Sequence, residues 1–382
     1  MLILDWSVPS PRSSAYPRFE RSIGRHAGGT AFLVAARQIA IAAAPRQITL
    51  IDLDSGAVML SLTLPSHAED SRDTIRTFTP ADGERQLAIT TDDSVYLANL
   101  HTGKITPLER PVGMLPYTPY GTLSKLLPDD HTLLVASYHL TIDVWDLRTG
   151  TRIFSLPAPP LDQNCAVHTL RDMYGSPYDP GQIVVNYEGT GEKIPYVSID
   201  ELGYSRMIGL QLAPDGGSIL WDRCYSTEIQ HVIFQPDGVQ VWNSTDISEL
   251  CCVDSKTGAV VRRVAGYWRL AGLLHNAQGD PASLVVTEAR TGDLHWLRFP
   301  DFERIGSVKL PSRSRYFETQ SAEAAFVYLE GDRTLARWSL HDGCVIDSLA
   351  FPHRVIRVTW CEPLRLGIVH TEDQRLHRVT LR

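Results

Sequence analysis

The sequence predicts an all-β protein, because one strand–turn–strand pattern recurs along the chain and no segment keeps the 3.6-residue apolar period of a helix. The pattern is clearest at residues 141–156, TIDVWDLRTGTRIFSL, where apolar and polar residues alternate on both sides of a turn. Similar hairpins are predicted at 48–62, 94–108, 196–210, 249–264, 294–308 and 335–349, with one further strand at 376–382. The turns are expected to use the positive φ that glycine adopts without strain, at Gly56, Gly103, Gly150, Gly258 and Gly343.

A second kind of hairpin, with a Pro-Asp-Gly type of turn, precedes several of the first kind. These hairpins are predicted at 79–93, 212–221 and 234–242. Two hairpins make four strands, and units of about 40 to 55 residues with four short antiparallel strands are typical of β-propeller blades. The sequence therefore predicts a single propeller of eight four-stranded blades. Seven blades is the alternative, if one copy in the irregular region 157–248 is an insertion within a neighbouring blade.

The whole chain, 1–382, is predicted to form one domain. Residues 355–382 supply only three strands to the last blade, which leaves an open sheet edge that invites mispairing. We expect the strand at 1–8, MLILDWSV, to fill this place and close the ring. Residues 9–29 are predicted to be an irregular segment, and 157–182 an irregular loop or insertion whose Pro and Tyr residues suit partner contact.

Composition limits the classes of partner and compartment. Lys and Arg number 36 against 44 Asp and Glu, and the resulting charge of −8 disfavours nucleic acid as a partner. The six cysteines lack the paired spacing of a zinc site and the density of a disulfide scaffold, which fits reduced thiols in the cytoplasm. No apolar run approaches the ~20 residues that cross a bilayer, and the first residues make a poor secretory signal. We therefore expect a cytoplasmic protein that binds neither nucleic acid nor membrane.

The end of the clearest hairpin resembles the end of a WD repeat, in Trp145-Asp146 and in Arg-Thr-Gly at 148–150. The Pro-Asp-Gly turns are similar to the first hairpin of that repeat, so the resemblance covers about 30–382. It extends equally to the broader group of quinoprotein-like propellers. The resemblance implies a rigid platform that assembles other proteins, commonly without catalysis.

WD repeats also contain a hydrogen-bonded network of a His, a Ser or Thr, an Asp and a Trp within the blade. Ser137 and Trp145 match two of these places, but Tyr138-His139 stand where an Asp is usual. No blade shows the complete set in its sequence.

Motifs that carry catalytic chemistry are incomplete in this chain. The adjacent Cys251-Cys252 are similar to the pair at the cofactor of quinone-dependent alcohol dehydrogenases, but those enzymes repeat a Trp after the Thr-Gly turn, where this chain has AVVRRV. Neighbours on a strand point to opposite faces, so we expect one thiol to pack in each of the two inter-blade layers. The fragments at 101–104 and 188–193 lack the spacing of a phosphate loop, and neither G-x-S-x-G nor H-E-x-x-H occurs. We predict no catalytic residue, cofactor or metal ligand.

Tryptophans at similar places in their hairpins, Trp145, Trp296 and Trp338, are expected to wedge between adjacent blades. Trp242 ends a strand before the loop NSTD and is a candidate for a binding face instead.

Two functions are compatible with this sequence. The first is a non-catalytic scaffold that binds a protein or peptide on one face of the propeller, alone or as a subunit of a larger complex. The alternative is an enzyme or small-molecule binder that uses the central channel, in the manner of the quinoprotein-like propellers. The candidate partner-binding residues, chosen by their place in the blade, are Asp92, Asp93, Tyr138, His139, Tyr187, Glu188, Trp242, Asn243, Glu372 and Asp373.

Overall fold

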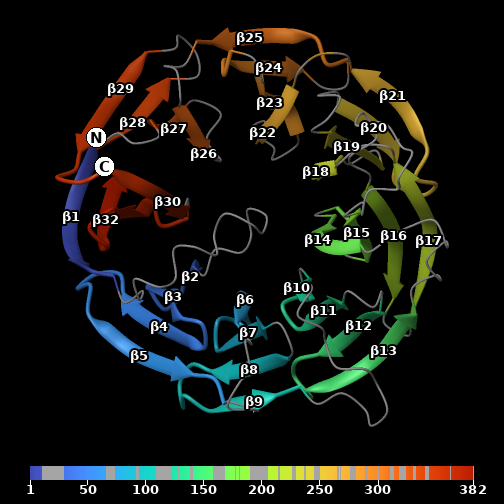
Figure 1. Cartoon of the computed structure of the whole chain (residues 1–382), viewed down its shortest axis with the longest axis horizontal. Helices are drawn as coiled ribbons and strands as arrows, with labels where there is room; N and C mark the ends of the chain where they lie inside the picture. Colours follow the sequence, from blue (N-terminus) through green and yellow to red (C-terminus); the bar gives the residue numbers. More distant parts are fainter. Residues whose placement is uncertain are drawn as a thin grey trace, which may run out of the picture.

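The computed structural model shows an all-β chain arranged as a ring of sheets (Figure 1). No helix in the described part of the chain is long and apolar enough to cross a membrane. The described residues are 1–10, 30–65, 74–91, 94–108, 122–127, 129–137, 141–157, 168–176, 178–179, 181–189, 205–213, 216–225, 229–235, 238–244, 250–264, 266, 268–275, 281–288, 291–298, 301–309, 314–317, 324–329, 333–339, 344–361 and 363–381.

Within these residues the strands form eight four-stranded antiparallel sheets, numbered here in chain order. Sheet 1 contains β2 (Thr30–Leu33), β3 (Gln38–Ala44), β4 (Gln47–Asp52) and β5 (Val58–Thr63), and sheet 2 contains β6 (Ile75–Ala81), β7 (Gln86–Thr91), β8 (Val95–Asn99) and β9 (Ile105–Pro107). Sheet 3 contains β10 (Thr122–Leu126), β11 (Thr132–Ser137), β12 (Thr141–Asp146) and β13 (Thr151–Pro157), and sheet 4 contains β14 (His168–Gly175), β15 (Gln182–Gly189), β16 (Ser205–Ala213) and β17 (Gly216–Tyr225).

The second half of the chain repeats the arrangement. Sheet 5 contains β18 (Ile229–Phe234), β19 (Val239–Ser244), β20 (Leu250–Asp254) and β21 (Val260–Val264), and sheet 6 contains β22 (Trp268–His275), β23 (Pro281–Glu288), β24 (Leu294–Arg298) and β25 (Arg304–Val308). Sheet 7 contains β26 (Ser314–Phe317), β27 (Ala324–Leu329), β28 (Thr334–Ser339) and β29 (Val345–Ala350), and sheet 8 contains β30 (Val355–Cys361), β31 (Leu366–Thr371), β32 (Arg375–Leu381) and β1 (Leu2–Pro9).

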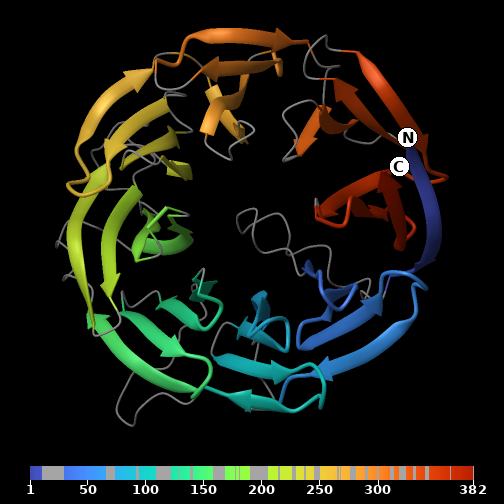
Figure 2. The same ribbon diagram turned by 180° about the vertical axis from the view of Figure 1, so that it is seen from behind.

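The sheets surround a central axis, with the first strand of each sheet nearest the axis and the last at the rim (Figures 1 and 2). Sheet 8 combines the two ends of the chain. Its outer strand, β1, pairs antiparallel with β32 from Leu2 opposite Leu381 to Pro9 opposite Arg375, with one irregularity after Leu4. The chain ends therefore lie side by side at the rim (Figure 1).

Packing between neighbouring sheets forms the core. The second strands are buried on both faces, as in β31, LGIVHT, whereas the outer strands are largely exposed, as in β29, VIDSLA. Cys251 packs with Val184, Met207 and Trp221 of sheet 4, while Cys252 packs with Leu284 and Val286 of sheet 6. The expected placement of one thiol in each inter-sheet layer is therefore confirmed.

The expected tryptophan wedges are confirmed in part. Trp145 is 1% exposed and packs against Ala88 and Val95 of sheet 2. Trp296 is buried as well, but Trp338 is only half-buried. Trp221 is a further wedge that the sequence comparison of hairpins did not single out.

The turns between third and fourth strands share one local structure. The side-chain oxygen of Asp52, Asn99 or Asp254 accepts hydrogen bonds from backbone N–H groups two and three residues later, at 2.7–3.2 Å. The glycine four residues later has positive φ and returns its N–H to the backbone carbonyl of the same Asp or Asn at 2.9 Å. Such side-chain bonds hold a tight turn without help from the rest of the fold. Positive φ is confirmed at four of the five predicted glycines, and Gly343 lies outside the described residues.

Two tryptophans fasten the outer strand of one sheet to the turn of the next. The Trp6 indole N–H of β1 donates to the Leu53 carbonyl at 2.9 Å, and that of Trp221 in β17 donates to the Ser255 carbonyl at 2.8 Å. Leu53 and Ser255 occupy the same position in equivalent turns, and each ring lies against the glycine of that turn. These contacts therefore lock sheet 8 to sheet 1, and sheet 4 to sheet 5.

The region from 157 to 248 differs from the sequence-based expectation. Residues 168–175, expected within an irregular loop, form β14, and the hairpin expected at 212–221 as the first of its unit is instead the second, joining β16 to β17. Of the hairpin predicted at 196–210, residues 196–204 lie outside the described residues. The remaining residues belong to β16, which pairs with β15 on one edge and β17 on the other. A Pro-Asp-Gly turn is compatible with both the first and the second hairpin of a sheet, so this turn alone does not show which hairpin a segment forms.

Candidate functional site

Antiparallel strand order divides the connections between two ends of the ring. Turns from first to second and from third to fourth strands, such as 34–37 and 147–150, lie at one end, which we call the turn end. Connections from second to third strands, such as 372–374, and those between sheets lie at the other, the loop end. The six candidates that the structure describes belong to the loop end or to strand residues next to it: Tyr187, Glu188, Trp242, Asn243, Glu372 and Asp373.

The candidates differ in how much of each residue the structure describes. Glu188 lies near the end of β15, and Trp242 and Asn243 lie in β19, where only the backbone is described. Asp92, Asp93, Tyr138 and His139 lie outside the described residues.

Tyr187 is a core residue of β15 and not a loop residue as expected. Its side chain is fully buried and packs between sheets 3 and 4, against Ile142 and Val185 among others. The hydroxyl has no hydrogen-bond partner among the described residues, and burial raises the pKa of Tyr187. The continuous apolar run Ile-Val-Val at 183–185 is the signal that the strand extends this far.

Glu372 and Asp373 occupy the turn between β31 and β32, at the loop end of sheet 8. Glu372 lies 3.9 Å from Arg354, and its backbone N–H donates to the Arg354 carbonyl at 2.9 Å. Asp373 lies 3.5 Å from His353. These contacts fasten the turn to the segment that enters sheet 8. The charged groups of Arg354 and Glu372 remain about 60% exposed, so they are available to a partner.

A buried network below this turn was missed by the sequence analysis. The Thr371 hydroxyl donates to Asp373 Oδ1 at 2.6 Å, and His377 Nε2 lies 2.8 Å from the same hydroxyl oxygen. Burial alone would raise the pKa of Asp373, but the Thr371 hydrogen bond and the nearby His353 lower it below its ordinary value. The His, Thr and Asp of the WD-type network are thus present, with a second histidine as fourth member.

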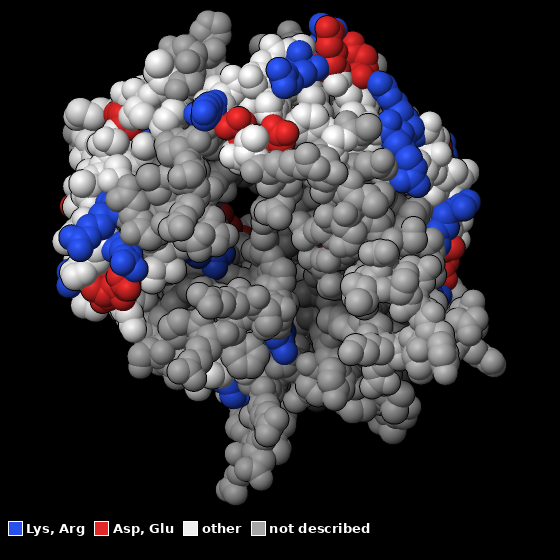
Figure 3. Space-filling model, turned by 45° about the horizontal axis from the view of Figure 1, so that its top comes forward, with Lys and Arg blue, Asp and Glu red and all other residues white. Residues whose placement is uncertain are grey.

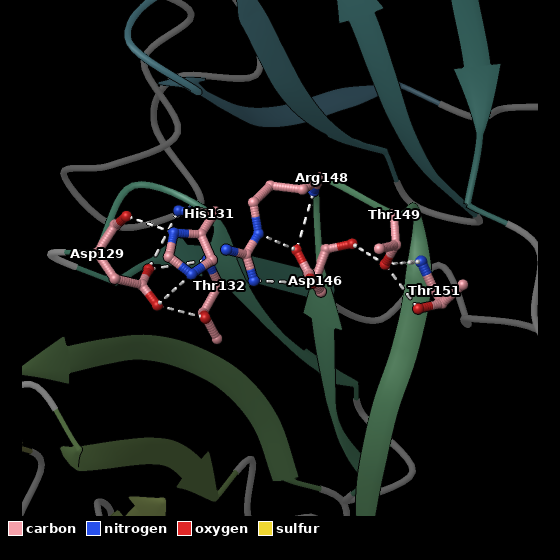
Figure 4. Close-up of polar contacts among 7 residues, drawn as sticks. All are labelled: Asp129, His131, Thr132, Asp146, Arg148, Thr149 and Thr151. Atoms are coloured by element: carbon pink, nitrogen blue, oxygen red, sulfur yellow. Dashed lines mark hydrogen bonds and ion pairs between the residues drawn. The ribbon is translucent and has the colours of Figure 1, made fainter. Parts of the chain in front are cut away.

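The turn end of sheet 3 carries the polar contacts drawn in Figure 4. Asp129 accepts the backbone N–H groups of His131 and Thr132 at 3.1 and 2.8 Å. Arg148 donates to both carboxylate oxygens of Asp146, at 3.0 and 3.1 Å, and this pairing lowers the pKa of Asp146. Each charge is matched within or beside its own turn, which gives this group a structural role.

Neighbouring turns are also linked across sheets at the turn end. The Glu84 carboxylate of sheet 2 accepts the backbone N–H groups of Val34 and Ala35 at 2.6 and 2.8 Å. The Asp130 carboxylate of sheet 3 accepts the N–H of Gly83. Three consecutive turns are therefore joined into a rigid end, whose carboxylates are engaged.

The surface view shows no large area of a single charge among the coloured residues. Lys or Arg and Asp or Glu lie next to one another on this face, and both signs are seen at the central hollow (Figure 3). Near the axis, burial lowers the pKa of Lys125 in β10, while the charge of Asp172 in β14 opposes the shift. No group of three potential metal-binding side chains occurs among the described residues.

Comparison with known proteins identifies the fold. The C-terminal WD40 domain of Sif2 is 10% identical, with a TM-score of 0.65 over 100% of this chain and 99% of that one. BamB from Moraxella catarrhalis is 12% identical, with a TM-score of 0.57 and full coverage of both chains. The chain is a β-propeller. The expected likeness to WD-repeat and quinoprotein-like propellers is therefore confirmed for the fold.

A third propeller with similar structure is an enzyme. Dihydro-heme d1 dehydrogenase NirN, solved in complex with DHE, is 12% identical, with a TM-score of 0.62 over 96% of this chain and 73% of that one. No family model and no curated protein matches the sequence. At these identities the propeller likeness concerns architecture alone.

Proposed function

We propose that this propeller is a non-catalytic scaffold that binds a protein or peptide at its loop end. The observation that carries the proposal is the fixed turn at 372–374, which presents Glu372 beside Arg354 on a rigid base. Exposed charges held in place before binding lose little freedom when a partner arrives, and they select for complementary charge. The likeness to a WD40 domain and to BamB supports an interaction role in general.

The finer architecture belongs to the same proposal. We infer that the eight sheets are the eight blades of one closed ring and that β1 closes it through its pairing with β32. A closed ring gives the loop end the rigidity that a scaffold needs. We also propose that the protein works in the cytoplasm, alone or as a subunit of a larger complex, and engages neither nucleic acid nor membrane.

Charge reversal at the two ends of the ring tests the scaffold function. Wild-type protein, Glu372→Lys and Glu303→Lys are used to capture partners from an extract of the native source, followed by mass spectrometry. Glu303 is a matched control, because it is a similarly exposed carboxylate, 63% against 60%, at the turn end. We expect a stoichiometric partner whose recovery falls about tenfold with Glu372→Lys and stays unchanged with Glu303→Lys. Equal recovery with both variants contradicts a binding site at the loop end.

A small-molecule function of the central channel is the second candidate. It is favoured by the likeness to NirN, a dehydrogenase solved with a bound ligand, and by Lys125 on the innermost strand β10, a half-buried amine whose pKa is lowered by burial. The same purification distinguishes it, because a tightly held organic cofactor recovered without a protein partner supports the channel and contradicts the scaffold.

A further inference from the structure

The hydrogen bonds at the loop end of sheet 8 determine which nitrogen of His377 carries a proton. The Thr371 hydroxyl has one hydrogen and two acceptors, Asp373 Oδ1 at 2.6 Å and the Arg375 carbonyl at 3.4 Å, and it donates mainly to the nearer carboxylate. With either acceptor the hydrogen points away from His377. The hydroxyl oxygen can therefore only accept from His377 Nε2, which lies 2.8 Å away. Neutral His377 must carry its hydrogen on Nε2 and its lone pair on Nδ1.

The second nitrogen of His377 is in a position that disfavours a second proton. Nδ1 is buried and has no hydrogen-bond partner among the described residues, and the ring meets Phe351 edge-on with centroids 5.1 Å apart. Burial lowers the pKa of His377, Asp373 opposes this, and the charges of Arg375 and His353 add to it. From β1, the residue opposite His377 is the uncharged Ser7, whose hydroxyl and carbonyl bind Arg375. The imidazolium form therefore does not fit the closed arrangement.

We propose that His377 is an acid-operated latch for the turn at 372–374: protonation at Nδ1 displaces the ring, breaks its bond to Thr371 and loosens the turn that carries Glu372. The latch regulates the binding end assigned above, so its biological use rests on the proposed scaffold function. Its mechanical part does not, because it concerns only the contacts between β31, β32 and the turn.

A second buried histidine provides an internal comparison. His295 in β24 lies opposite Val286, as His377 lies opposite Val369, and Trp268 meets its ring edge-on at 5.3 Å. The residue two positions after the cross-strand partner is Glu288 instead of a threonine, with its carboxylate 3.6 Å from Nε2. The His295 ring therefore has a carboxylate beside Nε2, whereas Nε2 of His377 ends a chain of hydrogen bonds through Thr371 to Asp373, which we call the relay. His295→Gln is therefore a matched control for His377→Gln.

Hydrogen exchange of the full chain between pH 7.5 and 5.5 tests the latch. We expect protection of the amides of residues 372–375, corrected for intrinsic exchange, to fall about tenfold on acidification in the wild type and in His295→Gln. His377→Gln keeps an N–H donor for Thr371 but cannot gain a proton, so protection should stay constant. An equal loss of protection in His377→Gln, or nitrogen chemical shifts that place the His377 proton on Nδ1 at pH 7.5, overturns the proposal.

A second variant keeps the test decisive if His377→Gln does not fold. Thr371→Val removes the relay while the histidine remains, so the turn should be loose already at pH 7.5 and gain little exchange at pH 5.5. A normal acid response in Thr371→Val contradicts the latch. Partner capture at both pH values is measured separately, so that failure of the scaffold function and failure of the latch give different results.

Discussion

Contacts of single residues at the sheet boundaries explain how the sheets of this chain stay joined although the sequence repeats only weakly. The tryptophans of β1 and β17 each reach across to a carbonyl in the next sheet and cover a glycine there. Glycine is needed at that point for two reasons, positive φ and the close approach of an indole ring. This requirement on the sequence is therefore local, because it restricts only the tryptophan and the turn glycine that are in contact.

Replacing the covered glycine should cost more than backbone strain alone. Gly258 has a φ of +67°, and a Cβ added there would lie 2.7 Å from the indole ring of Trp221. We expect Gly258→Ala to lower the free energy of unfolding by about 2 to 4 kcal/mol, measured by urea titration. Gly292→Ala is the control, because Gly292 also has positive φ but an added Cβ would meet nothing within 4 Å. Equal losses in both variants contradict a role for the indole contact.

The two adjacent cysteines should respond to substitution as apolar core residues. Cys252→Ser places a hydroxyl beside Leu284 and Val286, so it should cost about 1 to 3 kcal/mol of unfolding free energy. Cys251→Ser should cost less, because Arg263 donates to the Cys251 sulfur at 3.8 Å and can donate to a hydroxyl there. Cys344→Ser, at an exposed position, should cost almost nothing. In the native protein a thiol reagent should modify Cys344 before the buried pair, and rapid modification of Cys251 contradicts the burial.

At the scale of single strands, β32 makes the stability of the fold depend on pH, because it contains the buried His377. Burial keeps the pKa of His377 below the ordinary value of 6.5, so the unfolded chain takes up this proton at a higher pH than the folded one. The contribution of His377 to stability is therefore fully present above that value and is lost as the pH falls below it.

Unfolding at several pH values measures this contribution. We expect the free energy of unfolding to decline from pH 7.5 to 5.5 in the wild type and to decline less in His377→Gln. The two pH slopes should become equal above pH 7, where His377 is neutral in both the folded and the unfolded wild type. An unchanged pH slope in His377→Gln contradicts a lowered pKa.

Elements also show how far a sequence can predict this fold. The outer hairpins were predicted because alternation and a glycine turn are both local, as in TIDVWDLRTG, which forms β12 and its turn. β14, HTLRDMYG, was not predicted as a strand, because it follows a Pro-rich stretch and its apolar residues do not alternate regularly. At the site, Glu372 and Asp373 were placed correctly in a turn, but the relay beneath them was not found, since cross-strand register decides that Thr371 meets His377.

At the scale of the whole molecule, the contacts of β1 tie sheet 8 to the sheets on either side of it. β1 pairs with β32 along most of its length, Trp6 reaches the turn of sheet 1, and the backbone N–H of Leu2 donates to Asp347 of sheet 7 at 2.8 Å. One short strand thus joins three sheets.

Deleting residues 1–8 should lower the Tm sharply, by about 5 °C or more, since each kcal/mol lost shifts the Tm of a large domain by roughly 2 °C. Differential scanning calorimetry measures the change, and Trp6→Phe, which keeps the strand but removes the indole hydrogen bond, should give a smaller shift. An unchanged Tm after the deletion contradicts closure by β1.

The antiparallel pairing of β1 with β32 places both ends of the chain at the same end of one strand pair, where Leu2 faces Leu381. A pulling force applied to the two ends would open these hydrogen bonds one after another, like a zipper, and would not load them all together. We therefore expect the β1–β32 pair to be the first to separate under tension. Extraction by a machine that pulls on either end would begin there.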